Sequence, residues 1–211
     1  WLADNLDNVR ILDASWHMPN TKRNTLREFQ NAHIKNSNFF DLEKTSDQNS
    51  LLPHMLPDAK YWEETVSNLG IKNSDHIIVY DNSDVMSSCR IWYNFLYFGH
   101  NPDLISVLNG GLKKWLIEKK ETVSYDKCFS KSSYTVTEDL SMVLNKNQIN
   151  ENIKNKTFEL IDARSEERFH GLQLEPRKEL KSGNIEGSKN VPFMELINEK
   201  EQYECDRLCE E

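Results

Sequence analysis

The sequence predicts an α/β fold in which helices flank a central, mainly parallel sheet, and in which this plan occurs twice. Strand-like runs alternate with helical patterns from the N-terminus to Glu118, as in successive βαβ units. Among them, His76–Tyr80 (HIIVY) is a run of the kind found in a central parallel strand. A second series, which opens with a predicted strand at Phe158–Asp162, follows the first at an offset of about 150 residues.

The offset between the two series is nearly constant. Asp13 precedes Asp162 by 149 positions, and Ile34 precedes Ile185 by 151. Such a repeat predicts two tandem domains built on one plan, of which the second is incomplete. Along the chain, the predicted parts are a complete domain at residues 1–120, a Ser- and Lys-rich linker at 121–136 and a partial domain at 137–211.

Local signals predict where the helices of the first domain begin and end. Asn24 or Thr25 can cap one helix, and Asp58 can cap a second helix that Gly70 ends. In chain order, the predicted elements are a strand at Val9–Asp13, a helix at Leu26–Ala32, a strand at Asn36–Phe40, a helix from Asp58 to Gly70, a strand at His76–Tyr80, a helix at Cys89–Phe98, a strand at Ile105–Leu108, helices at Leu112–Glu118 and Thr137–Asn155, a strand at Phe158–Asp162 and a helix-prone tail at Glu195–Glu211.

Composition excludes some classes of partner. The net charge of −8 argues against nucleic acid and anionic membranes, because no cationic stripe offsets it. No apolar run approaches the ~20 residues that span a bilayer. The four cysteines favour free thiols in a reducing, cytoplasmic setting over a disulfide framework. The sequence starts at Trp1 rather than Met, so it is compatible with a targeting segment having been removed.

The loop Asp81–Ser88, which follows the strand His76–Tyr80, is the first candidate site. In parallel sheets, ligands collect beyond the carboxyl ends of the strands, where backbone N–H groups at a helix N-terminus can stabilise an anion such as a thiolate. The first residue of this loop, Asp81, is a carboxylate rather than a nucleophile. We therefore predict that the first domain is catalytically silent at its own loop.

Several short motifs along this chain follow one another in the same order as in a known protein family. They are LDASW (Leu12–Trp16), HIKNSNFFDLE (His33–Glu43), LPHMLP (Leu52–Pro57), IVYDNSD, SVLNGGLKKW (Ser106–Trp115), IDARSEERFHG and LEPR. Across essentially the whole chain, these motifs resemble the tandem-domain rhodanese family, and most of all its 3-mercaptopyruvate sulfurtransferase branch.

The resemblance implies two copies of the rhodanese fold, with an inactive N-terminal domain and a catalytic C-terminal one. It implies an enzyme in which a Cys thiolate takes sulfur from 3-mercaptopyruvate, as a persulfide, and passes it to cyanide or a thiol such as a thioredoxin-like protein. We predict no cofactor and no metal, and a cytoplasmic location, or a mitochondrial one in a eukaryote.

The catalytic Cys of that family opens a C-x-x-G-x-[TS] loop, which occurs nowhere in these 211 residues. The repeat offset puts the position equivalent to Asp81 near residue ~231. We therefore expect the nucleophilic Cys to be absent from this chain, and the chain alone to be inactive.

Four residues match positions that the family uses. Arg168 and Arg177 match its substrate-binding arginines, whose forked donors suit a 2-oxo carboxylate. His54 and Glu43 match a His–Asp relay beside the Cys, with Glu in place of Asp. The alternatives are surface or interdomain ion pairs for the two arginines and a solvated loop histidine for His54.

The cysteines of the chain are weaker candidates. Cys89 lies at a helix start beside Arg90, where a thiol can be reactive, although a buried, inert Cys is the expectation in this fold. Cys205 and Cys209 have helical spacing but no further His or Cys nearby, so we do not expect a metal site. Two alternative functions stay open, namely thiosulfate sulfurtransfer and a non-catalytic rhodanese-like binding or regulatory protein.

Overall fold

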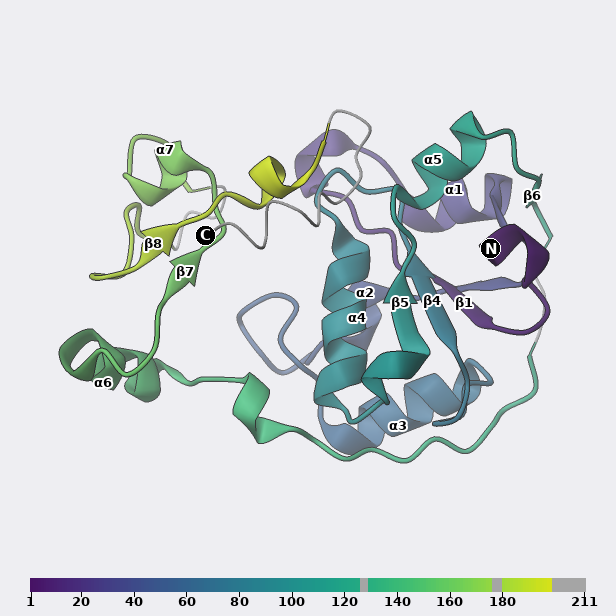
Figure 1. Ribbon diagram of the computed structural model, residues 1–211, viewed down its shortest axis with the longest axis horizontal. Helices are drawn as coiled ribbons and strands as arrows, with labels where there is room; N and C mark the ends of the chain where they lie inside the picture. Colours follow the sequence, from purple (N-terminus) through teal and green to yellow (C-terminus); the bar gives the residue numbers. More distant parts are fainter. Residues whose placement is uncertain (126–128, 176–179, 199–211) are drawn as a thin grey trace. The chain divides into compact units, whose positions relative to one another are not determined.

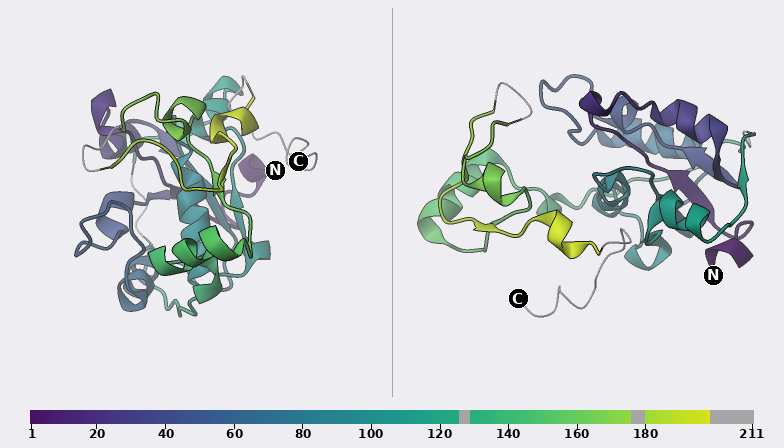
Figure 2. Two further views of the ribbon diagram at one scale, coloured as in Figure 1. Left: turned by 90° about the vertical axis from the view of Figure 1, so that its left-hand side faces the viewer. Right: turned by 90° about the horizontal axis from the view of Figure 1, so that it is seen from above.

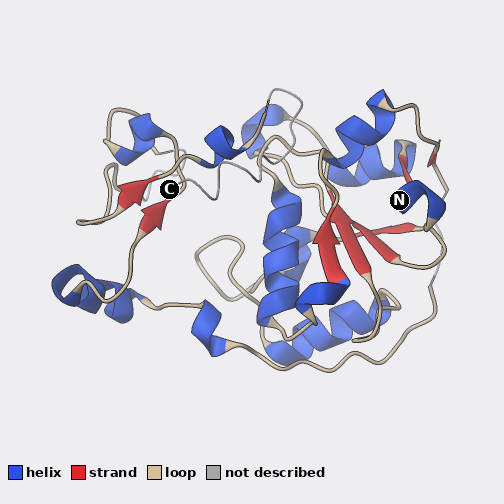
Figure 3. Ribbon diagram, in the orientation of Figure 1, coloured by secondary structure: helices blue, strands red, loops and turns tan. Residues whose placement is uncertain are grey.

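The computed structural model describes residues 1–125, 129–175 and 180–198, and the chain divides into two compact units (Figure 1). Unit 1 is Trp1–Met142, and unit 2 begins at Val143. Each unit is an α/β arrangement, as Figure 3 shows by its colouring of helices and strands. The boundaries predicted from the sequence, at residues 120 and 137, remain a proposal.

Unit 1 is organised around a four-stranded parallel sheet of order β3-β1-β4-β5. Its strands are β1 (Arg10–Asp13), β2 (His33–Ile34), β3 (Ser37–Phe39), β4 (Ile77–Tyr80), β5 (Ile105–Val107) and β6 (Thr122–Val123), with β2 and β6 forming a separate antiparallel pair. Its helices are α1 (Thr25–Asn31), α2 (Leu42–Thr45), α3 (Ala59–Asn68), α4 (Ser87–Tyr97) and α5 (Gly111–Ile117).

The sheet of unit 1 is covered on both faces, which explains why its central strand is apolar throughout. All four residues of β4 are buried. Ile77 and Val79 pack with α3 and α4, whereas Ile78 and Tyr80 pack with α5. This alternation is the period of two of a β-strand. The two further views in Figure 2 show the sheet between its helices.

The predicted caps of unit 1 are confirmed. The Asn24 side chain accepts a hydrogen bond from the backbone N–H of Arg27, and the Asp58 side chain accepts one from Tyr61. Gly70, just beyond α3, has a φ of +73°, and a Cβ there would lie 2.8 Å from the Cβ of Phe129. A side chain at this position is therefore excluded by both backbone conformation and space.

The predicted helix at Thr137–Asn155 is wrong in its first half. Leu140–Met142 is a 3-10 turn, and α6 begins only at Lys146. The reason is a capping box at Asn145, which starts a new helix there, while the backbone N–H of Thr137 donates to the carbonyl of Phe98 and is held in an extended segment.

The segment before that turn packs along unit 1. Tyr134 is 1% exposed and lies in the main core. The N–H of Ser132 donates to the carbonyl of Ser67, and the N–H of Tyr134 donates to the hydroxyl of the same serine. This stretch of the predicted linker is thus tied to the first unit by backbone and side-chain contacts.

The described part of unit 2 contains two helices and one pair of parallel strands. Its elements are α6 (Lys146–Asn155), β7 (Ile161–Asp162), α7 (Glu166–Phe169) and β8 (Lys189–Asn190), with β7 parallel to β8. The strand predicted at Phe158–Asp162 is present only over its last two residues. The predicted tail, Glu195–Glu211, lies outside the described residues apart from its start, where a 3-10 turn covers Phe193–Leu196.

We expect the amides of unit 2 to exchange faster with solvent than those of unit 1. Ile161 on β7 is 61% exposed, whereas Ile77 and Val79 on β4 are fully buried. Few buried apolar contacts lower the free energy of local opening. Native-state hydrogen exchange on the chain tests this, and protection around Ile161 as high as that around Val79 would contradict it.

Candidate active site

His54 and Glu43 lie together in unit 1, although eleven residues separate them in the sequence. His54 Nε2 is 3.1 Å from Glu43 Oε1. The His54 side chain is 17% exposed and that of Glu43 is 61% exposed. The pair therefore lies at the surface, with Glu43 exposed and His54 partly buried. This placement suits a group that must exchange protons with a bound molecule.

Short-range structure explains where each member of this pair points. Asp41 caps α2 by accepting a hydrogen bond from the N–H of Lys44, and Leu42 and Thr45 are buried, so Glu43 is on the exposed side of the helix. His54 has a φ of +56°, an uncommon value for a residue other than glycine. A guanidinium nitrogen of Arg90, on α4, donates to the His54 carbonyl and holds this bend.

A third member of this group, Trp16, is the last residue of the LDASW motif but was not singled out as a site residue from the sequence. Its indole Nε1–H donates to Glu43 Oε1 at 2.6 Å. Its ring also meets the ring of His54 edge-on, with the ring centroids 4.7 Å apart. Trp16 lies 27 positions before Glu43, and only the fold brings them together.

The loop that follows β4 holds Asp81 in the place where an anion could bind. The carboxylate of Asp81 accepts hydrogen bonds from the backbone N–H of Ser88 at 2.6 Å and of Ser83 at 3.2 Å. Burial raises the pKa of Asp81, and the hydrogen bonds from Ser88 oppose that rise. These N–H donors are taken up by the protein's own carboxylate, which supports the prediction of a silent loop.

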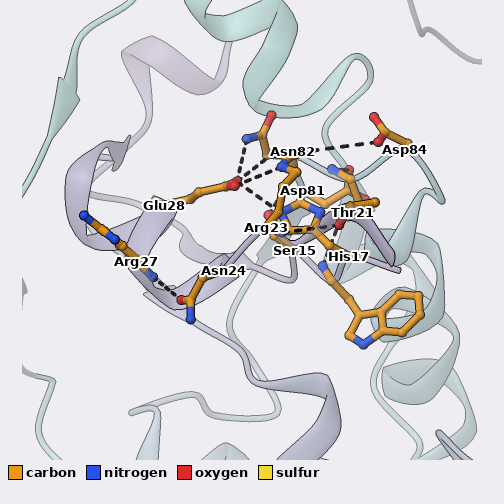
Figure 4. Close-up of polar contacts among 12 residues, drawn as sticks. Ser15, His17, Thr21, Arg23, Asn24, Arg27, Glu28, Asp81, Asn82 and Asp84 are labelled. Atoms are coloured by element: carbon orange, nitrogen blue, oxygen red, sulfur yellow. Dashed lines mark hydrogen bonds and ion pairs between the residues drawn. The ribbon is translucent and has the colours of Figure 1, made fainter. Parts of the chain in front are cut away.

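A polar network lies beside this loop, at the carboxyl ends of β1 and β4 (Figure 4). Glu28 accepts two hydrogen bonds from Arg23, at 2.6 and 2.9 Å, and one from the side-chain amide of Asn82 at 3.2 Å. The ring of His17 is 3.1 Å from the same carboxylate. The hydrogen bonds from Arg23 lower the pKa of Glu28, with burial opposing them. The charge of Glu28 is thus matched within the network by the Arg23 guanidinium.

In unit 2, Arg168 is engaged by a carboxylate. Its Nη2 and Nε lie 2.5 and 3.3 Å from Glu175, whose side chain is only 2% exposed. Arg164 also binds Glu175, at 2.7 Å, and reaches Asp162 at 2.6 Å. Hydrogen bonding from Arg168 is the main cause that lowers the pKa of Glu175. Glu175 therefore holds two guanidinium groups, and neither Glu175 nor Arg164 was singled out from the sequence.

Other candidate residues fall partly outside the described chain. Arg177, Cys205 and Cys209 are not among the described residues. Cys89, on α4, is of intermediate burial rather than fully buried. Within the ranges that the structure describes, no group of three His, Cys, Asp or Glu residues could hold a metal ion, and no helix is long and apolar enough to cross a membrane.

Comparison with known proteins gives concordant matches. The model of the rhodanese-like domain matches residues 1–118. Rat 3-mercaptopyruvate sulfurtransferase is 35% identical over 223 residues, which cover 100% of this chain and 74% of that protein. Rat thiosulfate sulfurtransferase is 38% identical, with 94% and 69% covered. Thiosulfate/3-mercaptopyruvate sulfurtransferase 2 of Arabidopsis thaliana is 40% identical, with 92% of this chain covered.

Solved structures agree with these matches. The crystal structure of SseA from Escherichia coli, described as a 3-mercaptopyruvate sulfotransferase with the rhodanese fold, superposes with a TM-score of 0.88 at 32% identity, covering 99% of this chain and 78% of that one. Tum1 protein from Saccharomyces cerevisiae gives a TM-score of 0.83 at 29% identity, covering 93% and 67%. The chain spans 63% of the length of the Arabidopsis sulfurtransferase 2 and 58% of a second plant relative, thiosulfate/3-mercaptopyruvate sulfurtransferase 1, mitochondrial, of Arabidopsis thaliana. It spans more of the other relatives named here.

Proposed function

Since the chain belongs to the rhodanese family, we propose that it takes part in sulfur transfer from 3-mercaptopyruvate to a thiol or cyanide acceptor through a Cys persulfide. Relatives named as 3-mercaptopyruvate and thiosulfate sulfurtransferases support the class of reaction. The observation that carries the proposal is the 3.1 Å contact between His54 and Glu43, which couples a histidine to an orienting carboxylate.

The proposed nucleophile belongs to sequence outside these 211 residues, which contain no C-x-x-G-x-[TS] loop. That assignment agrees with the greater length of the relatives. This chain spans 58–74% of the plant and rat sulfurtransferases of the mercaptopyruvate type. The buried carboxylate of Asp81 in the equivalent loop of unit 1 leaves no nucleophile at that position.

The proposed reaction has two transfers of sulfur. The Cys thiolate attacks the sulfur of mercaptopyruvate, the new S–S bond gives a persulfide, and the C–S electron pair passes to carbon as the enolate of pyruvate. That enolate then takes up one proton. An acceptor thiolate or cyanide finally attacks the outer sulfur and restores the Cys thiolate.

Proton handling is the role that we assign to His54. An ionised Glu43 only accepts hydrogen bonds, so the His54 nitrogen that faces it, Nε2, carries a proton in either charge state. The other ring nitrogen, Nδ1, is then the one that gains or releases a proton during turnover. Glu43 stabilises the protonated ring and fixes its orientation, as the carboxylate does in nucleophile–histidine–carboxylate triads.

Substrate binding is the role that we assign to Arg168 and Arg177. A 2-oxo carboxylate is bound well by forked guanidinium donors. The double contact of Arg168 with Glu175 fixes the plane of its guanidinium, so that its remaining donors have a set direction. Glu175 and Asp162 together balance the charges of Arg164 and Arg168, so the assigned role rests on the direction of the remaining Arg168 donors rather than on excess positive charge.

Replacing Arg177 with alanine should raise the KM for mercaptopyruvate at least tenfold in a chain that includes the Cys loop. One charged hydrogen-bonding contact contributes roughly 1.5–3 kcal/mol. Steady-state kinetics with the Arg27→Ala variant as control measures the effect, since Arg27 is exposed on α1. Unchanged kinetics in Arg177→Ala would refute the assigned role, and parallel assays with thiosulfate distinguish the two donors.

A non-catalytic binding role is the second candidate. The observation that favours it is the loop of unit 1, in which the carboxylate of Asp81 accepts the backbone N–H groups of Ser83 and Ser88. A protein with this role should bind mercaptopyruvate without consuming it. Isothermal titration together with a pyruvate assay separates the two functions.

A further inference from the structure

We infer that Trp16 is a positioning residue, which fixes Glu43 against His54, and that the silent loop of unit 1 serves as its anchor. The inference rests on the proposed role of His54 and adds the residues that set its geometry. It starts from one oxygen, Glu43 Oε1, which receives the indole N–H of Trp16 at 2.6 Å and lies 3.1 Å from Nε2 of His54.

The side chain of Glu43 is 61% exposed, so packing alone does not fix its rotamer. An exposed glutamate has several rotamers open to it, and ordering a single one costs conformational entropy. A hydrogen bond to a charged acceptor is about twice as strong as one between neutral groups. The indole is a rigid donor, so it can select the one Glu43 rotamer that faces the histidine.

The same indole also restricts the orientation of the His54 ring. Its ring meets the imidazole edge-on at a centroid distance of 4.7 Å, a favourable geometry for two aromatic rings. Behind His54, Arg90 holds the backbone carbonyl. The imidazole is thus bounded by the indole, by Glu43 and by its own fixed backbone.

Trp16 is in turn held by the silent loop. The backbone N–H of Trp16 lies 2.8 Å from Ser83 Oγ and 3.0 Å from Ser87 Oγ. The Ser87 hydroxyl donates to the carbonyl of Ala14 at 2.7 Å and so fixes the turn after β1. Asp81 orders this loop by accepting the N–H groups of Ser83 and Ser88.

The contacts therefore form a continuous path from the loop to the proposed proton carrier. Asp81 shapes the loop, the loop serines hold Trp16, and Trp16 orients the Glu43–His54 pair. The loop of unit 1 that is equivalent to the proposed nucleophile loop thus acts as the support of a proton-handling pair. The spacing of these residues along the chain does not predict that path.

The first test uses NMR on the 211-residue chain and needs no activity. In Glu43→Gln, the Trp16 indole N–H proton should move upfield, because its hydrogen-bond acceptor loses its charge. In Trp16→Phe, the ring resonances of His54 should shift toward those of a solvated histidine. The control is Trp92→Phe, which removes a partly exposed indole on α4. Glu43 is exposed, so its variant tests the contact even if Trp16→Phe folds poorly.

The second test is kinetic and uses a chain that includes the Cys loop. Trp16→Phe should lower kcat about tenfold with KM for mercaptopyruvate within about twofold, because one hydrogen bond to a charged group is lost and substrate binding is not. In a chain that already carries Glu43→Gln, adding Trp16→Phe should lower kcat little further, since both substitutions remove the same contact. Trp92→Phe should match wild type.

The outcomes separate the inference from the function on which it rests. An unmoved Trp16 indole resonance in Glu43→Gln, or fully additive kinetic losses, would overturn the positioning role while leaving sulfur transfer intact. Full activity in His54→Ala would instead refute the proposed role of His54, whatever the NMR shows of Trp16.

Discussion

Replacing His54 with alanine is expected to lower kcat for mercaptopyruvate by about 100-fold or more in a chain that contains the catalytic loop. A positioned acid–base group contributes typically 10²–10⁴-fold, and we use the lower end because solvent can replace part of the proton transfer at a partly exposed ring. The His54 side chain is 17% exposed. Substrate affinity should change little, since no carboxylate-binding role is assigned to this residue.

The natural control for this experiment is His170→Ala. His170 also lies near a glutamate, Glu166, at 3.8 Å, but its side chain is 53% exposed and no proton-handling role is assigned to it. Stopped-flow measurement of pyruvate release reports the first half-reaction directly. Loss of activity in His170→Ala with His54→Ala unaffected would reverse the assignment.

Replacing Asp13 with asparagine is expected to change the free energy of unfolding in a pH-dependent way. The difference between variant and wild type should be more favourable to the variant at neutral pH than at pH ~4, by roughly 2–3 kcal/mol. Burial raises the pKa of Asp13 from 3.8 to about 6, against the opposing hydrogen bonds from Ser15. Asparagine keeps the oxygen that accepts the N–H of Ser15, at 2.9 Å, and carries no charge to desolvate.

The direction of this effect follows from proton binding. The folded state holds the Asp13 proton more tightly than the unfolded state, so the stability that Asp13 contributes is fully present below pH ~4 and is lost as pH rises through about 6. The asparagine side chain does not titrate, so the Asp13→Asn variant has no such loss. The gap between the two chains in urea-unfolding free energy should therefore widen from pH ~4 to pH ~7. Glu64→Gln, at an exposed position of α3, is the control and should track wild type.

A constant gap between Asp13→Asn and wild type across that range would show that Asp13 is not held protonated by burial. A gap that narrows as pH rises would show that the folded state lowers the pKa of Asp13 rather than raising it. Asp13 is suited to this test because it lies at the end of β1 and is 2% exposed.

The parts of the fold that depend on neighbouring residues could be predicted from the sequence. The caps at Asn24 and Asp58 and the buried strand β4 each rest on signals within one or two turns of chain. The helix predicted at Thr137–Asn155 was wrong in its first half, because the contact between Thr137 and Phe98, which is not local, holds the start of that stretch extended.

The candidate site divides in the same way. The family motifs indicated Glu43 and His54, and the structure brings these two together. Trp16 and Glu175 were missed, since their roles arise from contacts with Glu43 and Arg168 that no spacing rule encodes. An indole donor or a buried acceptor looks like any core residue until its partner is known.

The mass of the protein after brief exposure to 3-mercaptopyruvate tests the proposed persulfide chemistry most directly. In a chain that includes the C-x-x-G-x-[TS] loop, we expect one cysteine-containing peptide to gain one sulfur atom, which cyanide or a reducing thiol then removes. The 211-residue chain, treated in parallel, should gain none and release no pyruvate. Pyruvate release by the 211-residue chain at a normal enzymatic rate, or turnover by the longer chain with no sulfur bound to any cysteine, would contradict that chemistry.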